Sequence, residues 1–262
     1  MVEALRERGW ARFPFEEVVL AWAAMARAAA LPRIADPGER QKWLTCEGTW
    51  FVGVDSLPND ARGAVPGGLP LPGAARAAAA ALYGDLPLHA AQISVTWPGY
   101  PRPRAGEGEA AFRYRLRRDA AHVDGLLPVG AERRRMLKER HAYILGLPLT
   151  SCGPGASPFV IWEGSHEVMR AAFATALDPL DEGEWADADL TGIYHSARRE
   201  VFETCRRVEI PARPGEAYLV HRHALHGVAP WKEGAAAPAE GRMIAYFRPE
   251  LPAGTRAWLA LP

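Results

Sequence analysis

Hydrophobic spacing predicts that the first third of the chain is mainly helical. Residues 16–30 are rich in alanine, and Val19 and Trp22 fall on one side of a helix drawn through them. Residues 74–83 predict a second helix, which follows a loop rich in proline and glycine. We therefore expect residues 1–88 to form a helical N-terminal part.

From residue 89 onward the pattern changes to short apolar segments that end at Gly, Pro or polar residues, which predicts strands. Two stretches with helical spacing interrupt them: residues 165–177, with Ser165 expected as the N-cap, and residues 194–206. With one earlier segment included, the expected strands span residues 50–54, 91–97, 143–149, 159–162, 208–210, 217–221 and 243–247.

Phe112, Tyr114 and Leu116 alternate with arginines, and this period-two pattern predicts a further strand. If that strand continues to Asp124, then His122 and Asp124 share the face of Phe112 and point into the interior. An imidazole and a carboxylate would then lie side by side in an enclosed space.

Short strands between turns, after a helical N-terminal part, indicate a mainly β protein with flanking helices, a β-sandwich or jelly roll. We expect a single domain over residues 1–262, with the β core in residues 89–250. A parallel α/β sheet is less consistent with the pattern, because strands and helices do not alternate regularly and no Gly-rich phosphate loop follows a strand.

Composition narrows the class of protein. The chain is 48% hydrophobic, as in proteins with a substantial core, and its net charge is +0, so we expect neither a nucleic-acid nor a membrane partner. No signal pattern opens the chain and its apolar stretches are short or contain arginine, so we expect a cytoplasmic protein. The sparse cysteines predict reduced thiols rather than disulfides or a zinc site: Cys46, Cys152 and Cys205.

Basic residues cluster between positions 102 and 140. They either attract an anionic substrate or form a solvated basic face, and the pattern leaves both interpretations open.

Two histidine-containing segments could supply metal ligands. His122 and Asp124 are two residues apart, which places both side chains on one face of an extended chain. His221, His223 and His226 follow a turn and a short apolar strand. Two histidines and one carboxylate occupy one face of an octahedral iron(II), leaving positions for a bidentate 2-oxo acid and dioxygen. From the residues alone, His221 and His223 are also ordinary polar residues at a strand end.

Arg242 opens the last expected strand, sixteen residues after His226. A cosubstrate with a distal carboxylate needs a fixed fork of donors, which arginine supplies and lysine does not. Arg248 lies on the same strand face by parity and is the second choice for this role.

Residues 92–249 resemble the phytanoyl-CoA dioxygenase (PhyH) family of iron(II)- and 2-oxoglutarate-dependent oxygenases. Five segments carry the resemblance, in the family's order, although Glu216 stands where the family has Asp and residues 234–240 lengthen the gap before the arginine. They are His122-Val123-Asp124, Gly164-Ser165-His166, Pro214-Gly215-Glu216, His226-Gly227 and Arg242.

The resemblance implies a double-stranded β-helix core (jelly roll, cupin-like) and selects His226 over the two neighbouring histidines. It implies that His122, Asp124 and His226 hold Fe(II), that Arg242 binds 2-oxoglutarate, and that O2 is consumed. The resemblance favours hydroxylation of a small-molecule substrate, anionic or neutral, with release of succinate and CO2, since related halogenases have a small residue in place of Asp124. Desaturation and ring chemistry stay open. The second 2-oxoglutarate contact is not evident, with Tyr143 as one candidate, and His166 is expected to be structural.

Two other functions stay open. A cupin-like metalloenzyme without 2-oxoglutarate would use His221, His223 and another ligand, and would not need Arg242. A non-catalytic binding module of the same fold would show no 2-oxoglutarate turnover. A Ser-His-Asp hydrolase is disfavoured, because no serine lies in a Gly-x-Ser-x-Gly elbow.

Overall fold

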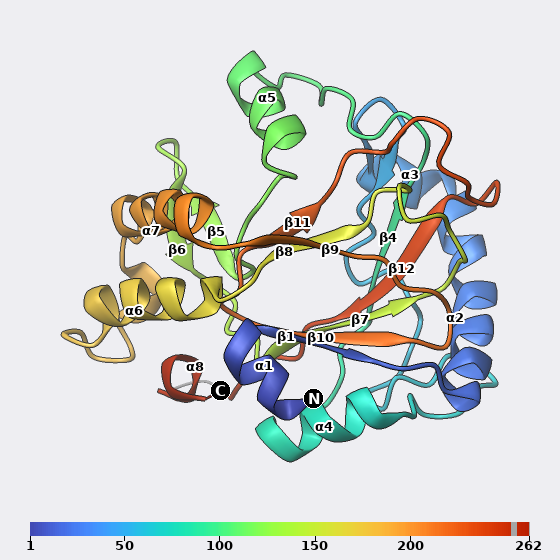
Figure 1. Ribbon diagram of the computed structural model, residues 1–262, viewed down its shortest axis with the longest axis horizontal. Helices are drawn as coiled ribbons and strands as arrows, with labels where there is room; N and C mark the ends of the chain where they lie inside the picture. Colours follow the sequence, from blue (N-terminus) through green and yellow to red (C-terminus); the bar gives the residue numbers. More distant parts are fainter. Residues whose placement is uncertain (253–255, 262) are drawn as a thin grey trace.

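Two antiparallel sheets face each other at the centre of the protein, in a computed structural model that describes residues 1–252 and 256–261 (Figure 1). The large sheet has the order β1-β10-β7-β12-β4-β3-β2, and the small sheet the order β11-β8-β9. The large sheet consists of β1 (Trp10–Phe13), β2 (Leu44–Thr45), β3 (Trp50–Phe51), β4 (Gln92–Thr96), β7 (Tyr143–Pro148), β10 (Ala217–His221) and β12 (Arg242–Phe247). The small sheet consists of β8 (Phe159–Trp162), β9 (Arg207–Ile210) and β11 (His226–Val228).

Helices surround the sheets, and a hairpin of β5 (Leu126–Val129) and β6 (Arg134–Leu137) lies beside α7 at one end of the molecule (Figure 1). The helices are α1 (Val2–Arg8), α2 (Glu17–Ala35), α3 (Pro37–Trp43), α4 (Ala74–Tyr83), α5 (Glu109–Arg117), α6 (Ser165–Leu177), α7 (Thr191–Thr204) and α8 (Ala257–Ala260), with a 3-10 turn η1 (Trp185–Asp187).

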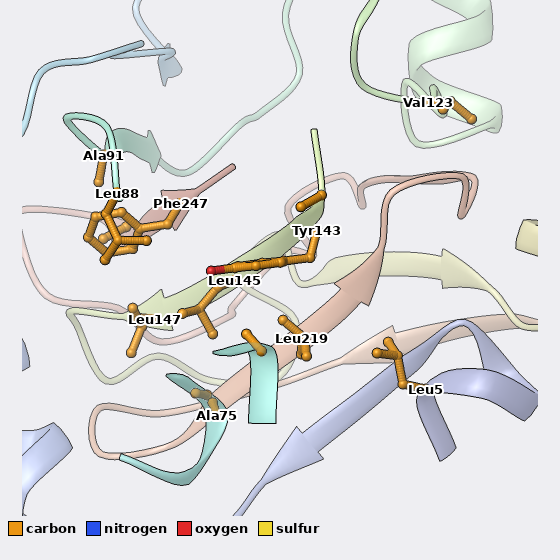
Figure 2. Packing of buried hydrophobic residues seen from close by; sticks show 14 of the residues in the cluster. Leu5, Ala75, Leu88, Ala91, Val123, Tyr143, Leu145, Leu147, Leu219 and Phe247 are labelled. Carbon is orange, nitrogen blue, oxygen red and sulfur yellow. The ribbon is translucent and has the colours of Figure 1, made fainter. Parts of the chain in front are cut away.

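The large sheet is apolar on both faces because both are covered. Strand β7 is buried along its whole length. Ile144 points toward the small sheet and joins an inner cluster, whereas Leu145 and Leu147 belong to the outer core beneath the helices. Figure 2 shows these two leucines with Leu219 of β10 around Ala75 of α4. Each such leucine contributes about 1.5–3 kcal/mol by leaving water.

The inner cluster fills the space between the two sheets. It is made by β7, β8, β9, β10 and β12, which contribute the side chains of Ile144, Phe159, Ile161, Ile210, Tyr218, Val220, Ile244 and Tyr246, with Ala224 from the following loop. The protein is therefore mainly β with flanking helices, as expected. The candidate site borders the inner cluster, in the space between the two sheets.

Most expected elements are present. Strands β8 and β10 and helix α4 have the expected bounds, and β12 starts one residue earlier, at Arg242. Residues 1–88, expected to form a helical part, contain helices α1 to α4 but also supply β1, β2 and β3 to the large sheet. The four residues of β1 pair with β10 at the edge of that sheet. Strand β1 and the β5–β6 hairpin were not expected from the pattern, because these strands mix exposed and buried residues, whereas β8, also of four residues, is an unbroken apolar run.

The strand expected at residues 112–116 is wrong, because these residues lie in helix α5. Glutamate, alanine and arginine are strong helix formers, and their propensity outweighs the alternating pattern here. An ion pair between Glu109 and Arg113, one helical turn apart, adds to this. His122 and Asp124 are therefore not the continuation of a strand from Phe112.

Helix α2 is longer than expected, with 19 residues, and buries Val19, Trp22, Ala23 and Ala26 as predicted. By length and mean hydropathy it is the one helix among the described residues that could cross a membrane, contrary to the expectation that every apolar stretch falls short. A core helix passes the same test, and the buried side chains of α2 pack in the outer core.

Candidate metal centre

The backbone brings His122 and His226 together. The two residues form an isolated antiparallel bridge, in which each N–H donates to the other's carbonyl at 2.8 and 3.0 Å. Gly227 permits this approach, because a Cβ there would lie 2.1 Å from the carbonyl oxygen of Asp119. The His-Gly sequence is thus required by chain packing as well as by chemistry.

Asp124 completes a compact set of three ligand groups. Its Oδ1 lies 3.1 Å from Nε2 of His122 and 3.7 Å from Nε2 of His226. One ligand atom from each of the three residues lies within 4.8 Å of the others. Two imidazole nitrogens and one carboxylate oxygen are the donor set that suits a non-haem iron(II) with open positions.

Each imidazole is oriented by a hydrogen bond at Nδ1, the ring nitrogen that does not face Asp124. Nδ1 of His122 lies 3.0 Å from the carbonyl of Ala120, and Nδ1 of His226 lies 2.9 Å from that of Ala224. A neutral imidazole that donates from Nδ1 keeps its lone pair on Nε2, the atom that faces Asp124. This is the arrangement in which histidine binds a metal. The ring of His226 is further held by stacking on Phe159 at 5.4 Å.

The carboxylate of Asp124 is ionised although it is buried. Burial alone would raise its pKa, but the positive charge of Arg248 and the neighbouring His226 and His122 hold the pKa well below its usual value. Arg248 Nη1 lies 3.4 Å from Oδ2, the oxygen that does not face the histidines. An ionised carboxylate beside two imidazoles is a donor set that can bind a cation.

The three residues line a cavity of about 210 Å³ between the sheets. Its walls are mostly apolar, and its charged side chains are Asp124 and Arg248. The remaining lining comes from Trp50, Val52, Val54, Gln92, Ser94, His122, Ile144, Phe159, His226, Gly227, Val228 and Tyr246. A mostly apolar cavity with a few convergent polar groups is the usual form of a small-molecule site.

Arg242 lies at the start of β12, in a smaller cavity of about 20 Å³ that Cys152 and Tyr218 also line. It is 5% exposed, its Nη1 has no hydrogen-bond partner, and no carboxylate among the described residues pairs with it. A buried cation without a counter-ion is costly. Arg242 therefore fits a role in holding an anion from outside the chain.

Two tyrosines lie between Arg242 and the larger cavity. We call this larger cavity, which His122, Asp124 and His226 line, the metal cavity. The hydroxyl of Tyr218, beside Arg242, is 3.0 Å from that of Tyr246, which lines the metal cavity. Gly146 leaves room for them, since a Cβ there would be 2.3 Å from the Tyr218 ring. Arg248, the second choice for the carboxylate-binding role, lines the metal cavity directly.

His221 and His223 lie away from the metal cavity, as the family spacing implied. Nδ1 of His221 accepts from the backbone N–H of His223, and the His223 ring packs on Trp258 at 4.3 Å. His166 packs on His221 and its Nε2 lies 2.9 Å from the carbonyl of Arg6. These three histidines are structural.

The Gly-Ser-His segment supports the metal centre from behind. Gly164, not Ser165, is the N-cap of α6, with a φ of 80° that favours glycine. The Ser165 hydroxyl instead accepts from the backbone N–H of Leu225 at 2.9 Å, next to His226. In the Pro-Gly-Glu turn, Glu216 binds Arg12 of β1 and has no part in the site.

Tyr143 does not fit a 2-oxoglutarate contact, because it points to the opposite face of β7 and packs on Tyr83 at 5.3 Å.

Sequence reasoning missed the pair of Arg207 with Asp119, which are joined at 2.7 and 2.9 Å. Asp119 precedes His122, and its carbonyl accepts from the backbone N–H of Val228, so this pair anchors both segments that carry the candidate ligands. No local pattern signals it, since the partners are 88 residues apart.

Part of the basic stretch is paired with acids. Arg113 and Arg115 bind Glu109 and Glu107, Arg134 binds Glu132, and Lys138 binds Asp187. These pairs reduce the positive charge of the stretch, and both interpretations of it stay predictions.

Solved structures with a similar fold include AviO1 from Streptomyces viridochromogenes Tue57, with a TM-score of 0.50 and 16% identity over 96% of this chain and 96% of AviO1. SnoK, a non-heme alpha ketoglutarate dependent carbocyclase from nogalamycin biosynthesis, has a TM-score of 0.48 and 15% identity over 94% of this chain and 82% of SnoK. EctD from S. alaskensis with bound Fe has a TM-score of 0.48 and 18% identity over 99% and 82%.

At these identities the likeness concerns the fold alone, and of the three only AviO1 reaches a TM-score of 0.50. No protein-family model matches the chain, and neither does any curated protein. The resemblance to the phytanoyl-CoA dioxygenase family thus rests on the motifs themselves.

Proposed function

We propose that this protein is an iron(II)- and 2-oxoglutarate-dependent oxygenase that hydroxylates a small organic substrate. The observation that carries the proposal is the meeting of His122, Asp124 and His226 on the wall of a mostly apolar cavity. His122, Asp124 and His226 would hold Fe(II), and Arg242 would bind the distal carboxylate of 2-oxoglutarate. With 2-oxoglutarate and O2, iron(II) supplies an oxidant for C–H bonds, with succinate and CO2 as products.

The chain's own residues prepare the site for that chemistry. The carbonyls of Ala120 and Ala224 orient the two imidazoles, and the charge of Arg248 keeps Asp124 ionised. The apolar walls exclude water, so a substrate C–H bond can lie near the metal without competing solvent. Arg242 offers a buried guanidinium whose Nη1 has no hydrogen-bond partner among the residues that the structure describes.

We infer a double-stranded β-helix, the fold that the motifs imply. Strand alternation along the chain supports this inference. The chain runs from β4 in the large sheet to His122 beside the small sheet, then to β7 in the large sheet and β8 and β9 in the small sheet. Strands β10, β11 and β12 continue the alternation. Successive strands that cross between two sheets make a jelly roll.

Anaerobic titration tests the proposal. Addition of iron(II) and then 2-oxoglutarate should produce the visible charge-transfer band of the chelate. Arg242→Gln should weaken 2-oxoglutarate binding roughly 10- to 100-fold while iron binding is retained, because a charge-assisted pair is lost from a dry site. Equal 2-oxoglutarate affinity in this variant would show that another group holds the carboxylate.

A metalloenzyme of the same fold that does not use 2-oxoglutarate is the second candidate. It is supported by the separation of Arg242 from the metal cavity by Tyr218 and Tyr246. It would not use His221 and His223 as first envisaged, because among the described residues the clustered ligands are His122, Asp124 and His226. Iron binding without any charge-transfer band, at any 2-oxoglutarate concentration, would favour this candidate.

A further inference from the structure

Arg248 is the one cationic arginine or lysine on the wall of the metal cavity. It follows the last residue of β12, and its side chain is 15% exposed. Asp124 is the one carboxylate on the same wall. A guanidinium in a mostly apolar cavity attracts an anion more strongly than the same group does in bulk water.

The backbone of Arg248 is fixed from both sides. Its N–H donates to Nε2 of His89 at 2.9 Å, and its carbonyl lies 2.9 Å from Nδ1 of His141. His141 is in turn held by Glu139, at 3.0 Å from Nε2. A side chain carried on backbone that is anchored in this way is well placed to position a ligand.

The guanidinium of Arg248 has donors to spare. Its contact with Asp124 is 3.4 Å long, at the weak end of hydrogen-bond distances, and its Nε has no partner although it is buried. Buried donors are normally satisfied. The planar fork of a guanidinium matches a carboxylate, which accepts two parallel N–H bonds.

We propose that Arg248 is the residue that anchors the substrate, by binding a carboxylate of a small molecule whose body is apolar. The inference rests on the proposed function. In the assembled site, the two charges of the metal are opposed by Asp124 and by the 2-oxo acid end of the cosubstrate, whose other carboxylate pairs with Arg242. Glu139 also interacts with Arg248, but it lines the neighbouring cavity and not the metal cavity. Within the metal cavity, one substrate carboxylate would therefore neutralise the remaining positive charge of Arg248.

The walls select the rest of the molecule. Trp50, Val52, Ile144, Phe159 and Val228 offer apolar or aromatic surface, so a flat or aliphatic body is favoured over a sugar or a polyamine. The side chain of His122 is 51% exposed, which marks the open side of the cavity. A carboxylate at Arg248 therefore leaves the body of the substrate beside the metal-binding residues.

Competition between matched acids and amides tests the proposal. Anaerobic protein with iron(II) and saturating 2-oxoglutarate is titrated calorimetrically with 3-phenylpropionate, hexanoate and their amides. The wild type should bind at least one acid roughly tenfold or more tightly than its amide. Arg248→Gln should abolish this preference, and Arg248→Lys should keep part of it because the charge stays while the fork is lost.

Arg12→Gln is the matched control, since it removes one exposed charge on β1 and should leave the preference unchanged. A wild type without preference for either acid overturns the proposal. A loss of 2-oxoglutarate affinity in Arg248→Gln also overturns the proposal, because Arg248 would then bind the cosubstrate and not the substrate. An Arg248→Gln variant that loses iron affinity but keeps the preference for the acid would show that Arg248 only positions Asp124. That result also overturns the proposal.

Failure of the proposed function gives a different result. In that case the wild type shows no charge-transfer band with iron(II) and 2-oxoglutarate. The acid and amide titrations are then repeated on zinc-loaded protein, and they still show whether Arg248 prefers a carboxylate.

Discussion

Single residues decide the chemistry of the site, and the clearest case is the choice among three neighbouring histidines. His221, His223 and His226 lie within six residues, yet His226 alone faces Asp124. The other two are buried against aromatic and imidazole rings. The difference arises because the chain turns after His221, where the N–H of Ala224 donates to the His221 carbonyl.

Replacing these histidines should separate metal binding from stability. His226→Ala should reduce iron affinity by at least about 100-fold, since even groups behind the ligands are worth 10- to 100-fold. His223→Ala should leave iron affinity within a few-fold but lower the free energy of unfolding by about 2–4 kcal/mol, because it opens a cavity beside Trp258. Iron content by metal analysis and unfolding in urea measure the two effects. Retained iron in His226→Ala would refute the ligand set.

At the scale of elements, the site depends on contacts between segments far apart in the chain. Helix α6 begins at Ser165, and its hydroxyl holds the backbone of Leu225 just before β11. Arg207 at the start of β9 binds Asp119 in the segment that leads to His122. These contacts explain how short, irregular segments present two ligands in a fixed relation.

Ser165→Ala should leave the buried N–H of Leu225 without a partner. We expect a loss of about 1–3 kcal/mol in the free energy of unfolding and a reduced affinity for iron, because the following residue is His226. Ser196→Ala is the matched control, since Ser196 is an exposed helical serine on α7 and should change stability by less than about 0.5 kcal/mol. Equal effects of the two substitutions would contradict the supporting role of Ser165.

At the scale of the whole molecule, buried histidines make stability depend on pH. Burial lowers the pKa of His166, and it lowers those of His221 and His223 well below the usual value, with Arg222 adding to the effect on the last two. These groups stay neutral in the folded protein but take up protons in the unfolded chain. Stability is therefore full above the unfolded pKa of about 6.5 and falls as the pH drops below it.

We expect the free energy of unfolding to fall between pH 7 and pH 5 by up to about 1.4 kcal/mol per pH unit for each of these histidines. His223→Phe keeps a ring against Trp258. It should reduce the change in the free energy of unfolding per pH unit by the amount that one of these histidines contributes. Urea unfolding of metal-free protein at a series of pH values measures it. A variant with the wild-type slope would show that His223 does not contribute.

The sequence by itself predicted many of the helices and strands and the three candidate ligand residues. Periodicity predicted α4, β8 and β10 with their bounds, because each buries one regular face or a short apolar run. His122, Asp124 and His226 were identified from motif spacing, and the structure brings these three residues together. Alternation failed at residues 112–116, where helix propensity and the pair of Glu109 with Arg113 determine the structure.

Only the tertiary structure decided which cavity each of two arginines enters, Arg242 at the start of β12 and Arg248 just after its end. Both share one strand face, which parity alone could predict, but Arg242 lies beyond Tyr218 and Tyr246 while Arg248 lies beside Asp124. Which cavity a side chain enters depends on rings contributed by other strands, and those contacts are not encoded in local spacing. Strand periodicity determines which face of the sheet a side chain points to, whereas packing between the two sheets determines which residues it contacts there.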